Sequence, residues 1–275
     1  MLRHPRIILA SLVGLGCVCL LLWYFSIRPS NDRVWAADQR VLPVAEFAGD
    51  SVTVRNVRNN RYRSTTDYDI AYEDRTYDLR ALESLWYVVE PFSDWEGAAH
   101  TFLSFGFADG QYVSVSIEIR KEEGEEFSAW KGLLRRYEIM YVVADERDVI
   151  ALRTNHRKDD VFLYPIRASE EQMRSLFISM LERANALSAQ PEFYNTLTNT
   201  CTTGIVEHLN ALVEEDVSLW DRRVLAPGYS DTLAYELGLI DTDLPVEEIR
   251  SRFRINALAE QYADDPAFSQ RIRGR

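Results

Sequence analysis

The chain has 275 residues, of which 47% are hydrophobic and 12% aromatic, and its net charge is −12. This length suffices for one good core with a small appendage, and the composition excludes a disordered protein. Because nucleic acids and the anionic faces of membranes attract basic proteins, the negative charge argues against both as partners. The sequence contains no phosphate-binding or dinucleotide-binding motif and no metal-ligand cluster, so we expect neither a cofactor nor a metal.

The N-terminus carries an apolar run, Ile7–Ile27, of about the 20 residues that a helix needs to cross a bilayer. Arg3 and Arg6 precede the run, which predicts that the short basic end stays in the cytoplasm and that the rest of the chain lies outside it. Trp23, Tyr24 and Phe25 stand where an interfacial aromatic belt is expected. We therefore predict a membrane partner for residues 7–27.

Two alternatives to an uncleaved anchor are open. A cleaved signal peptide is one, although the run is long for it and no small-x-small cleavage site follows. A lipoprotein site at Cys17 is the other, although Gly14 occupies the place of the expected large aliphatic residue.

The third cysteine, Cys201, lies far from the membrane-like run that holds Cys17 and Cys19. It therefore has no disulfide partner in the exported part of the chain. Extracytoplasmic proteins usually pair or avoid cysteines, so an unpaired one there is a candidate reactive thiol.

After a polar exit segment, residues 29–40, β-branched and aromatic residues predict several short strands. The predicted strands before the middle of the chain cover residues 51–57, 68–79 and 86–89.

The stretch HTFLSFGFADGQYVSVSIEIR, residues 100–120, predicts a β-hairpin with Ala108, Asp109 and Gly110 as its loop. For the two apolar faces to coincide, paired residue numbers must sum to 218. His100 then lies opposite Glu118, with Ser116 diagonal to it, and facing Cβ atoms are about 5 Å apart. This pattern predicts a catalytic base, His100, with its orienting carboxylate, Glu118, and with Ser116 lining a substrate cleft. An unimportant surface ion pair is the alternative.

Beyond the hairpin, the pattern predicts strands at residues 136–143, 149–152 and 161–164, and then a helix up to Leu187 that opens with a capping box of Ser169 and Gln172. A turn and short helix are predicted for residues 226–239, and a last helix begins at Asp243 and Pro245.

A loop, residues 195–200, opens into a helix that places Cys201 in the first turn. Unpaired N–H groups and the helix dipole favour a thiolate there, so Cys201 is the predicted nucleophile. Asn199 and Gly204 flank it and are predicted to contact substrate, Gly204 because it leaves room for a substrate or a strand. His208 lies two turns further on, about 10 Å too far along the axis to take the thiol proton. The alternative is a buried cysteine that only packs.

With these residues in place, the exported portion resembles the Lnb N-terminal periplasmic domain family. The phrases that carry the resemblance are AAHTFLSFGF, VSVSIEIRKEEGE, DERDVIALRTN, LYP, FYNTLTNTCTTGI and PGYSD. The resemblance implies a circularly permuted relative of the papain and NlpC/P60 thiol enzymes, with Cys201 as nucleophile and His100 as base. It also implies acyl-transfer chemistry, because Lnb itself is a lipoprotein N-acyltransferase.

We therefore predict an α+β fold with an antiparallel sheet packed against helices. The expected organisation is a membrane anchor in residues 1–28, a periplasmic domain in residues 29–240 and a C-terminal helical extension in residues 241–275. The expected protein is a single-pass protein of the inner membrane with its soluble domain in the periplasm.

The expected function is that of a cysteine-dependent acyltransferase or hydrolase, whose partner is an acyl donor lipid or a cell-envelope peptide. A peptidoglycan-directed amidase and a noncatalytic tethered binding module are the alternatives.

Overall fold

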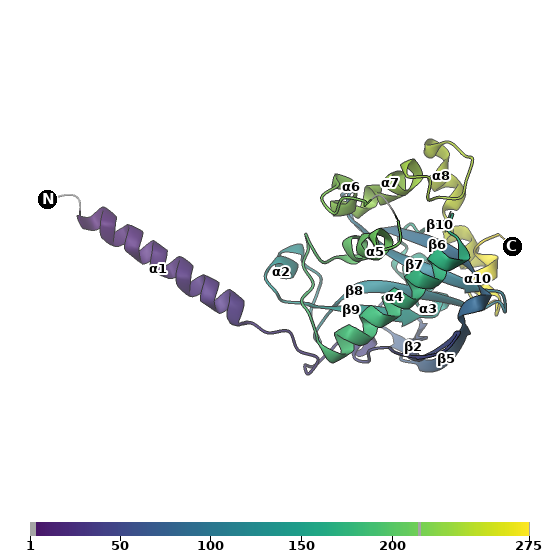
Figure 1. The fold of residues 1–275 in the computed structure, drawn as a ribbon, viewed down its shortest axis with the longest axis horizontal. Helices are drawn as coiled ribbons and strands as arrows, with labels where there is room; N and C mark the ends of the chain where they lie inside the picture. The colour runs from purple at the N-terminus through teal and green to yellow at the C-terminus, as the bar shows by residue number, and fades with distance from the viewer. Residues whose placement is uncertain (1–3, 214–215, 275) are drawn as a thin grey trace.

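The computed structural model describes residues 4–213 and 216–274. Helix α1 (His4–Ser26) stands away from the folded domain (Figure 1). Its segment Ile8–Ser26 has a mean hydropathy of 2.3 and no part buried in the protein, so it is long and apolar enough to span a membrane. Arg3, which the sequence analysis uses to orient the span, lies outside the described residues.

The domain is built on one curled sheet, in which neighbouring strands are antiparallel apart from a single parallel bridge between Arg58 and Ala144. The strand order is β1-β2-β9-β8-β7-β6-β10, and β5 also pairs with β2. The strands of this sheet are β1 (Val44–Ala48), β2 (Ser51–Arg58), β5 (Tyr72–Asp78), β6 (Leu82–Pro91), β7 (Ala99–Phe107), β8 (Tyr112–Arg120), β9 (Glu138–Ala144) and β10 (Phe162–Ile166). A separate small sheet pairs β3 (Arg61–Tyr62) with β4 (Tyr68–Asp69).

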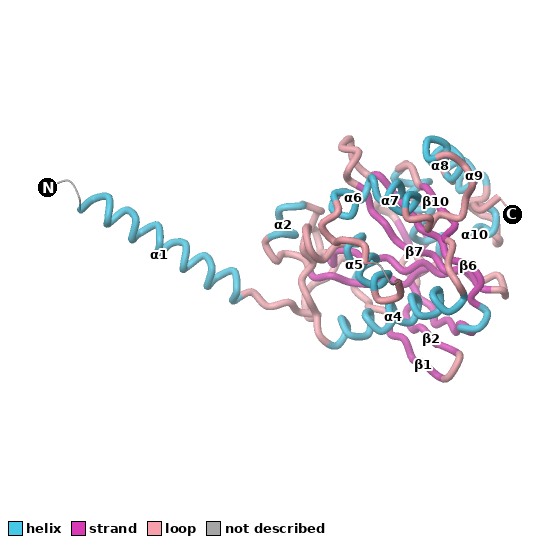
Figure 2. The backbone as a smooth tube through the Cα atoms, turned by 45° about the horizontal axis from the view of Figure 1, so that its top comes forward, coloured by secondary structure: helices cyan, strands magenta, loops and turns pink. Residues whose placement is uncertain are grey.

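Helices cover both faces of the large sheet. One face, here the α4 face, is crossed by the long helix α4 and by α5, as Figure 2 shows. The helices on and beside the α4 face are α4 (Glu170–Ala189), α5 (Cys201–Asn210), α6 (Arg222–Leu225) and α7 (Ser230–Glu236). The other face, the α3 face, is covered by α3 (Glu146–Ala151), the π-helical turn Leu152–Arg157, α9 (Asn256–Gln261) and α10 (Phe268–Arg271). Helices α2 (Ala129–Leu133) and α8 (Val246–Phe253) lie at the periphery (Figure 1).

Each face has its own apolar core because side chains alternate along a strand. On β7, Leu103, Phe105 and Phe107 belong to the larger core beneath α4. Phe102 belongs to the smaller core beneath α3.

Most predicted elements are confirmed. The β7–β8 hairpin has the predicted register, with Phe102 opposite Ser116 and Gly110 at a φ of +85° in the loop. Helix α4 opens with the predicted capping box of Ser169 and Gln172. The predicted α+β class, with a sheet packed against helices, is confirmed.

Two local predictions are wrong. Residues 149–152 are helical, because Asp145 caps α3 by accepting the N–H of Arg147 and the run Val149–Leu152 is apolar without being committed to a strand. The single last helix is two helices, α8 and α9, separated by an extended residue at Arg254.

Residues 241–274 contribute side chains to the core. Phe268, Ile272 and Ala259 are buried in the α3-face core. The side chain of Arg273 pairs with Glu146, at 2.8 Å for Nη1 to Oε2, and neither side chain is exposed. The C-terminal residues therefore close one face of the sheet instead of extending from the domain.

This buried pair gives a first prediction. Glu146→Ala leaves the Arg273 guanidinium buried without its carboxylate, and losing one partner of a buried pair costs about 3 to 5 kcal/mol. We expect a drop of this size in the free energy of unfolding, measured with urea on the full chain in detergent. The control is Asp241→Ala, whose partner Arg167 is exposed; the expected cost is below about 1 kcal/mol. Equal effects of the two changes would contradict the prediction.

Candidate functional site

The β7–β8 hairpin brings His100, Ser116 and Glu118 together on the α3 face. Nε2 of His100 lies 2.7 Å from Oγ of Ser116 and 3.7 Å from Oε1 of Glu118. The Ser116 hydroxyl donates to Oε1 of Glu118 at 2.9 Å. Glu118 therefore meets the imidazole chiefly through the hydroxyl of Ser116.

The protonation of this group follows from its surroundings. Burial, helped by the positive charge of Arg153, lowers the pKa of His100 to about 3, so its imidazole is neutral near pH 7. Burial alone would raise the pKa of Glu118, but Arg153 and Arg58 outweigh it and hold the pKa well below its usual range. Because Ser116 gives its one hydroxyl hydrogen to Glu118, the hydrogen between His100 and Ser116 must come from Nε2. His100 is thus a neutral donor.

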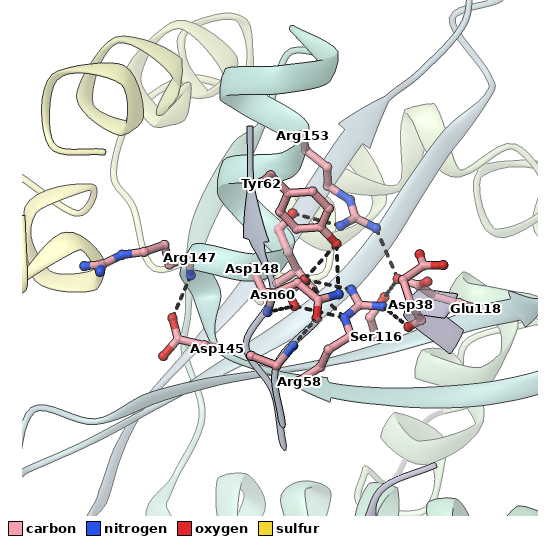
Figure 3. A network of polar contacts seen from close by, with 12 residues as sticks. Asp38, Arg58, Asn60, Tyr62, Ser116, Glu118, Asp145, Arg147, Asp148 and Arg153 are labelled. Atoms are coloured by element: carbon pink, nitrogen blue, oxygen red, sulfur yellow. Dashed lines mark hydrogen bonds and ion pairs between the residues drawn. The ribbon is translucent and has the colours of Figure 1, made fainter. Parts of the chain in front are cut away.

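A network of buried charges surrounds these residues (Figure 3). Arg153 donates to Glu90 and to Oε1 of Glu118, the latter at 3.2 Å. Arg58 pairs with Asp148 at 2.9 Å. These contacts tie α3 and the π-helical turn to strands β2, β6 and β8.

The predicted serine-lined cleft is not found at Ser116, although the side chains of His100 and Glu118 remain 15% and 14% exposed. Ser116 is fully buried, and Ser104, two residues further along β7 from Phe102, donates to Glu146 of α3. The physical reason is that α3, α9 and α10 cover this face. In the described structure Ser116 contacts His100 and Glu118, not a surface that a substrate can reach.

Cys201 lies on the other face of the sheet. It is the first residue of α5, as predicted, and Thr200 caps the helix by accepting the N–H of Thr203. Cys201 packs in the α4-face core with Ile117 and Leu103, whereas His100 stacks on Phe102 in the α3-face core. The sheet therefore separates the predicted nucleophile from the predicted base, and His100 is not placed to take the proton of Cys201.

The histidine of α5 itself, His208, is also not placed to take the proton of Cys201. His208 lies between the hydroxyls of Tyr141 at 2.9 Å and Ser179 at 3.0 Å. Burial lowers its pKa to about 4. It is a packed helix residue, as predicted.

Hydroxyl groups surround Cys201 on the α4 face. Its sulfur lies 3.7 Å from Oγ1 of Thr202, which in turn lies 2.9 Å from Oγ1 of Thr101. The hydroxyl of Tyr87 donates to Oγ of Ser230 at 2.7 Å. Burial raises the pKa of Tyr87 well above its usual value, and a negative charge on Cys201 would raise it further. These side chains therefore offer hydrogen bonds to a polar group beside the thiol.

An apolar pocket begins beside these hydroxyls. Its cavity volume is about 110 Å³. The hydroxyl-bearing residues Tyr87, Thr202 and Ser230 form one polar portion of its wall, and Arg167 and Gln172 form another; the rest of the lining is apolar. The apolar wall comes from α4, α5, α6, α7 and the strands behind them, with Leu85, Leu103, Ile166, Leu176, Ile205, Val206, Leu209, Leu212, Val224, Leu233, Ala234 and Leu237.

The other two predicted substrate contacts have structural partners here. Asn199 donates from Nδ2 to the carbonyl of Phe193 at 3.0 Å and closes the turn before α5. A Cβ at Gly204 would lie 2.7 Å from Cδ1 of Ile117. Of the two roles that the sequence allowed for Gly204, close approach of a strand is the one observed, since it lets α5 pack on β8.

Sequence reasoning missed Tyr87, Thr101, Thr202 and Ser230. Thr101 could have been found from the sequence, because it is a polar residue within the apolar face of β7. In the parts of the chain that the structure describes, no group of three or more His, Cys, Asp and Glu residues is arranged to hold a metal ion.

Comparison with known proteins identifies the family. The model of the Lnb N-terminal periplasmic domain matches residues 68–234, and the chain belongs to this family. The matched range includes β7, β8, α5 and the start of α7, and so spans both the charged network and Cys201. Searches of curated proteins and of solved structures found no match. The family and the N-terminal apolar helix together fit a single-pass membrane protein with a periplasmic domain.

The low pKa of His100 predicts a pH-dependent stability. The folded imidazole protonates near pH 3 and the unfolded one near pH 6.5, so the unfolded chain binds more protons between these values and stability falls as the pH falls through this window. We expect His100→Gln, which keeps a hydrogen-bond donor, to flatten the dependence of the unfolding free energy between pH 6.5 and 4. His156→Gln is the control, at a partly exposed position where burial also lowers the imidazole pKa but less strongly, and we expect it to flatten the dependence less. If the unfolding free energy of His100→Gln depended on pH as strongly as that of the wild type, the prediction of a neutral His100 imidazole would be wrong.

The separation of His100 from Cys201 predicts the reactivity of the thiol. Because the sheet lies between them, His100→Gln leaves the alkylation rate of Cys201 by iodoacetamide within about twofold of the wild-type rate at every pH. Thr202→Val removes the hydroxyl nearest the sulfur and changes that rate. Mass spectrometry of the Cys201 peptide distinguishes its thiol from Cys17 and Cys19. A strong slowing by His100→Gln alone would show that the imidazole does reach the sulfur.

Proposed function

We propose that this member of the Lnb N-terminal periplasmic domain family binds the acyl chain of a lipid or lipoprotein in the pocket on its α4 face. The observation that carries the proposal is the composition of the pocket: a mostly hydrocarbon lining that includes the hydroxyls of Tyr87, Thr202 and Ser230, with the sulfur of Cys201 3.7 Å from the Thr202 hydroxyl. An acyl ester has the same division, with an apolar tail and a polar carbonyl. Pockets for small ligands are typically mostly apolar, with a few placed polar groups.

The energetics favour such a ligand. Each methylene group that leaves water for an apolar lining contributes about 0.8 kcal/mol. A cell-wall peptide, the ligand of the alternative amidase, would instead bring amide and carboxylate groups against side chains that offer them few partners, which costs binding energy. The lining therefore favours a lipid over a peptide.

We further propose that Cys201 accepts the acyl group. Its sulfur would attack the ester carbonyl, forming a C–S bond and breaking the C–O bond, and the departing alcohol would take the proton that the thiol lost. Water or an amine would then take the acyl group from the thioester and return the proton to the sulfur. Backbone N–H groups at the start of α5 support the developing oxyanion. The product is a free fatty acid in the first case and an acylated amine in the second.

A second candidate function is noncatalytic binding of the same chain. It is favoured by the position of His100 on the α3 face, which deprives Cys201 of the base that the sequence predicted. In this candidate Cys201 only packs in the core beside Thr202 of the pocket wall, and the domain holds a lipid near the inner membrane.

Filling the pocket tests the binding that both candidates share. Ala234→Trp places an indole among the lining residues, and we expect the affinity for a fluorescent fatty acid to fall at least tenfold. Val34→Trp adds the same ring at an exposed site away from the pocket and leaves the affinity unchanged. Unchanged affinity in Ala234→Trp would contradict the proposed site.

Mass spectrometry then separates the two candidates. After incubation with phospholipid, an acyl adduct on Cys201 that is absent from Cys201→Ser supports transfer. Tight binding in both proteins with no adduct and no released fatty acid supports binding alone.

A further inference from the structure

Large apolar side chains are exposed around the short helix α2. Trp130 is 75% exposed, and Phe127 and Leu134 on either side of it are about half exposed, at 49% and 48%. Two further exposed residues join them. Phe92 meets Phe127 edge to face, with ring centroids 6.0 Å apart, and Leu197 follows Thr196, whose hydroxyl donates to the carbonyl of Ala129 in α2. We call these five residues the α2 surface.

The α2 surface adjoins the end of α1. The hydroxyl of Tyr24 donates to the carbonyl of Leu133 at 3.3 Å. The guanidinium of Arg135 lies 4.6 Å from the centre of the Tyr24 ring and 5.1 Å from that of Phe25. Figure 1 shows α2 on the side of the domain from which α1 departs. The aromatic end of the apolar helix and the exposed apolar residues of the domain are therefore neighbours.

We propose that the α2 surface docks on the outer leaflet of the membrane that α1 spans. The position of the α2 surface favours a bilayer as its partner. This surface lies next to the point where the spanning helix leaves the hydrocarbon of the membrane, so it is held at the level of the lipid headgroups. Tryptophan and other aromatic residues favour that level, where an apolar ring and a polar edge both find partners. Lys131, whose side chain is 43% exposed and lies 3.5 Å from Glu125, and the exposed Arg136 are close in sequence to Trp130 and carry the charge that lipid phosphates attract. The domain then rests on the bilayer at α2 instead of swinging freely on its linker.

Docking also bears on the thiol. The turn formed by residues 195–199 contacts α2 through Thr196 and leads directly into α5 at Cys201. When α2 is docked, only the turn of residues 195–199 therefore separates the start of α5 from the membrane-facing residues. The inference rests on the proposed membrane insertion of α1, but it does not need Cys201 to be catalytic.

The six tryptophans allow a test on the full chain in lipid vesicles. The vesicles contain phospholipid brominated near the headgroup end of its acyl chains, which quenches tryptophans at that depth. The emission of one tryptophan is the difference between the wild type and a variant that lacks it. We expect the Trp130 signal, from Trp130→Phe, to be blue-shifted and reduced at least twofold by the brominated lipid. Trp220, 69% exposed before α6, is the matched control and should keep its emission.

Trp23 near the end of α1 separates the two possible failures. Quenched Trp23 with unquenched Trp130 would overturn docking while leaving the anchor in place. If neither is quenched, α1 is outside the bilayer and both the anchor and the docking are wrong. Equal quenching of Trp130 and Trp220 would overturn a contact confined to α2.

Discussion

The alternation of side chains along β7 is the constraint on which the site depends. Successive residues of a strand point to opposite faces, so His100 and Thr101 enter different layers of the domain. Helix α5 crosses the face that Thr101 occupies, and Thr202 bonds to Thr101 there. A change of rotamer cannot carry an imidazole through a hydrogen-bonded sheet. The thiol therefore lies near hydroxyl groups and not near the imidazole. This follows from the change of face between His100 and Thr101, which are neighbours on β7.

The charged network on the α3 face contributes more to positioning α3 and the π-helical turn than to the free energy of folding. Burying ion pairs costs desolvation that their attraction barely offsets, whereas removing one partner is expensive. Each charge in the network has an opposite partner, and Arg153 has two, Glu90 and Glu118. Such pairs tolerate few alternative arrangements. Thus they fix where α3 and the π-helical turn lie against the strands, and His100 completes the set as a neutral donor, not as a base.

Local features of the fold could be read from the sequence because they depend on neighbours in the chain. The hairpin register follows from its loop and its two alternating runs, the start of α4 from the Ser169–Gln172 capping box, and the start of α5 from the polar loop before Cys201. The run Val149–Leu152 is ambiguous by nature, because four apolar residues fit a strand or a buried helix equally well. The N-terminal cap at Asp145 makes this run helical.

The candidate site was predicted less well because it depends on which face each helix covers. The register argument places His100 opposite Glu118, and both are found on one face. Nothing in the periodicity of β7 or α5 tells which face α5 crosses, because about 100 residues separate the two elements. The pocket is still less visible from the sequence, since its wall is assembled from several helices and three sheet strands.

The proposed pocket ligand and the proposed docking of the α2 surface address one physical problem, the exposure of an acyl chain to water. An acyl chain that crosses water between bilayer and protein loses about 0.8 kcal/mol for each exposed methylene, so free transfer of a long chain is slow. A domain that stays against the membrane shortens this exposure. Here the turn of residues 195–199 joins the α2 surface to the first residue of α5, and the hydroxyls beside that residue form part of the pocket wall. Through these contacts the proposed docking of α2 is linked to the N-terminal end of α5, where Cys201 lies next to the pocket residue Thr202.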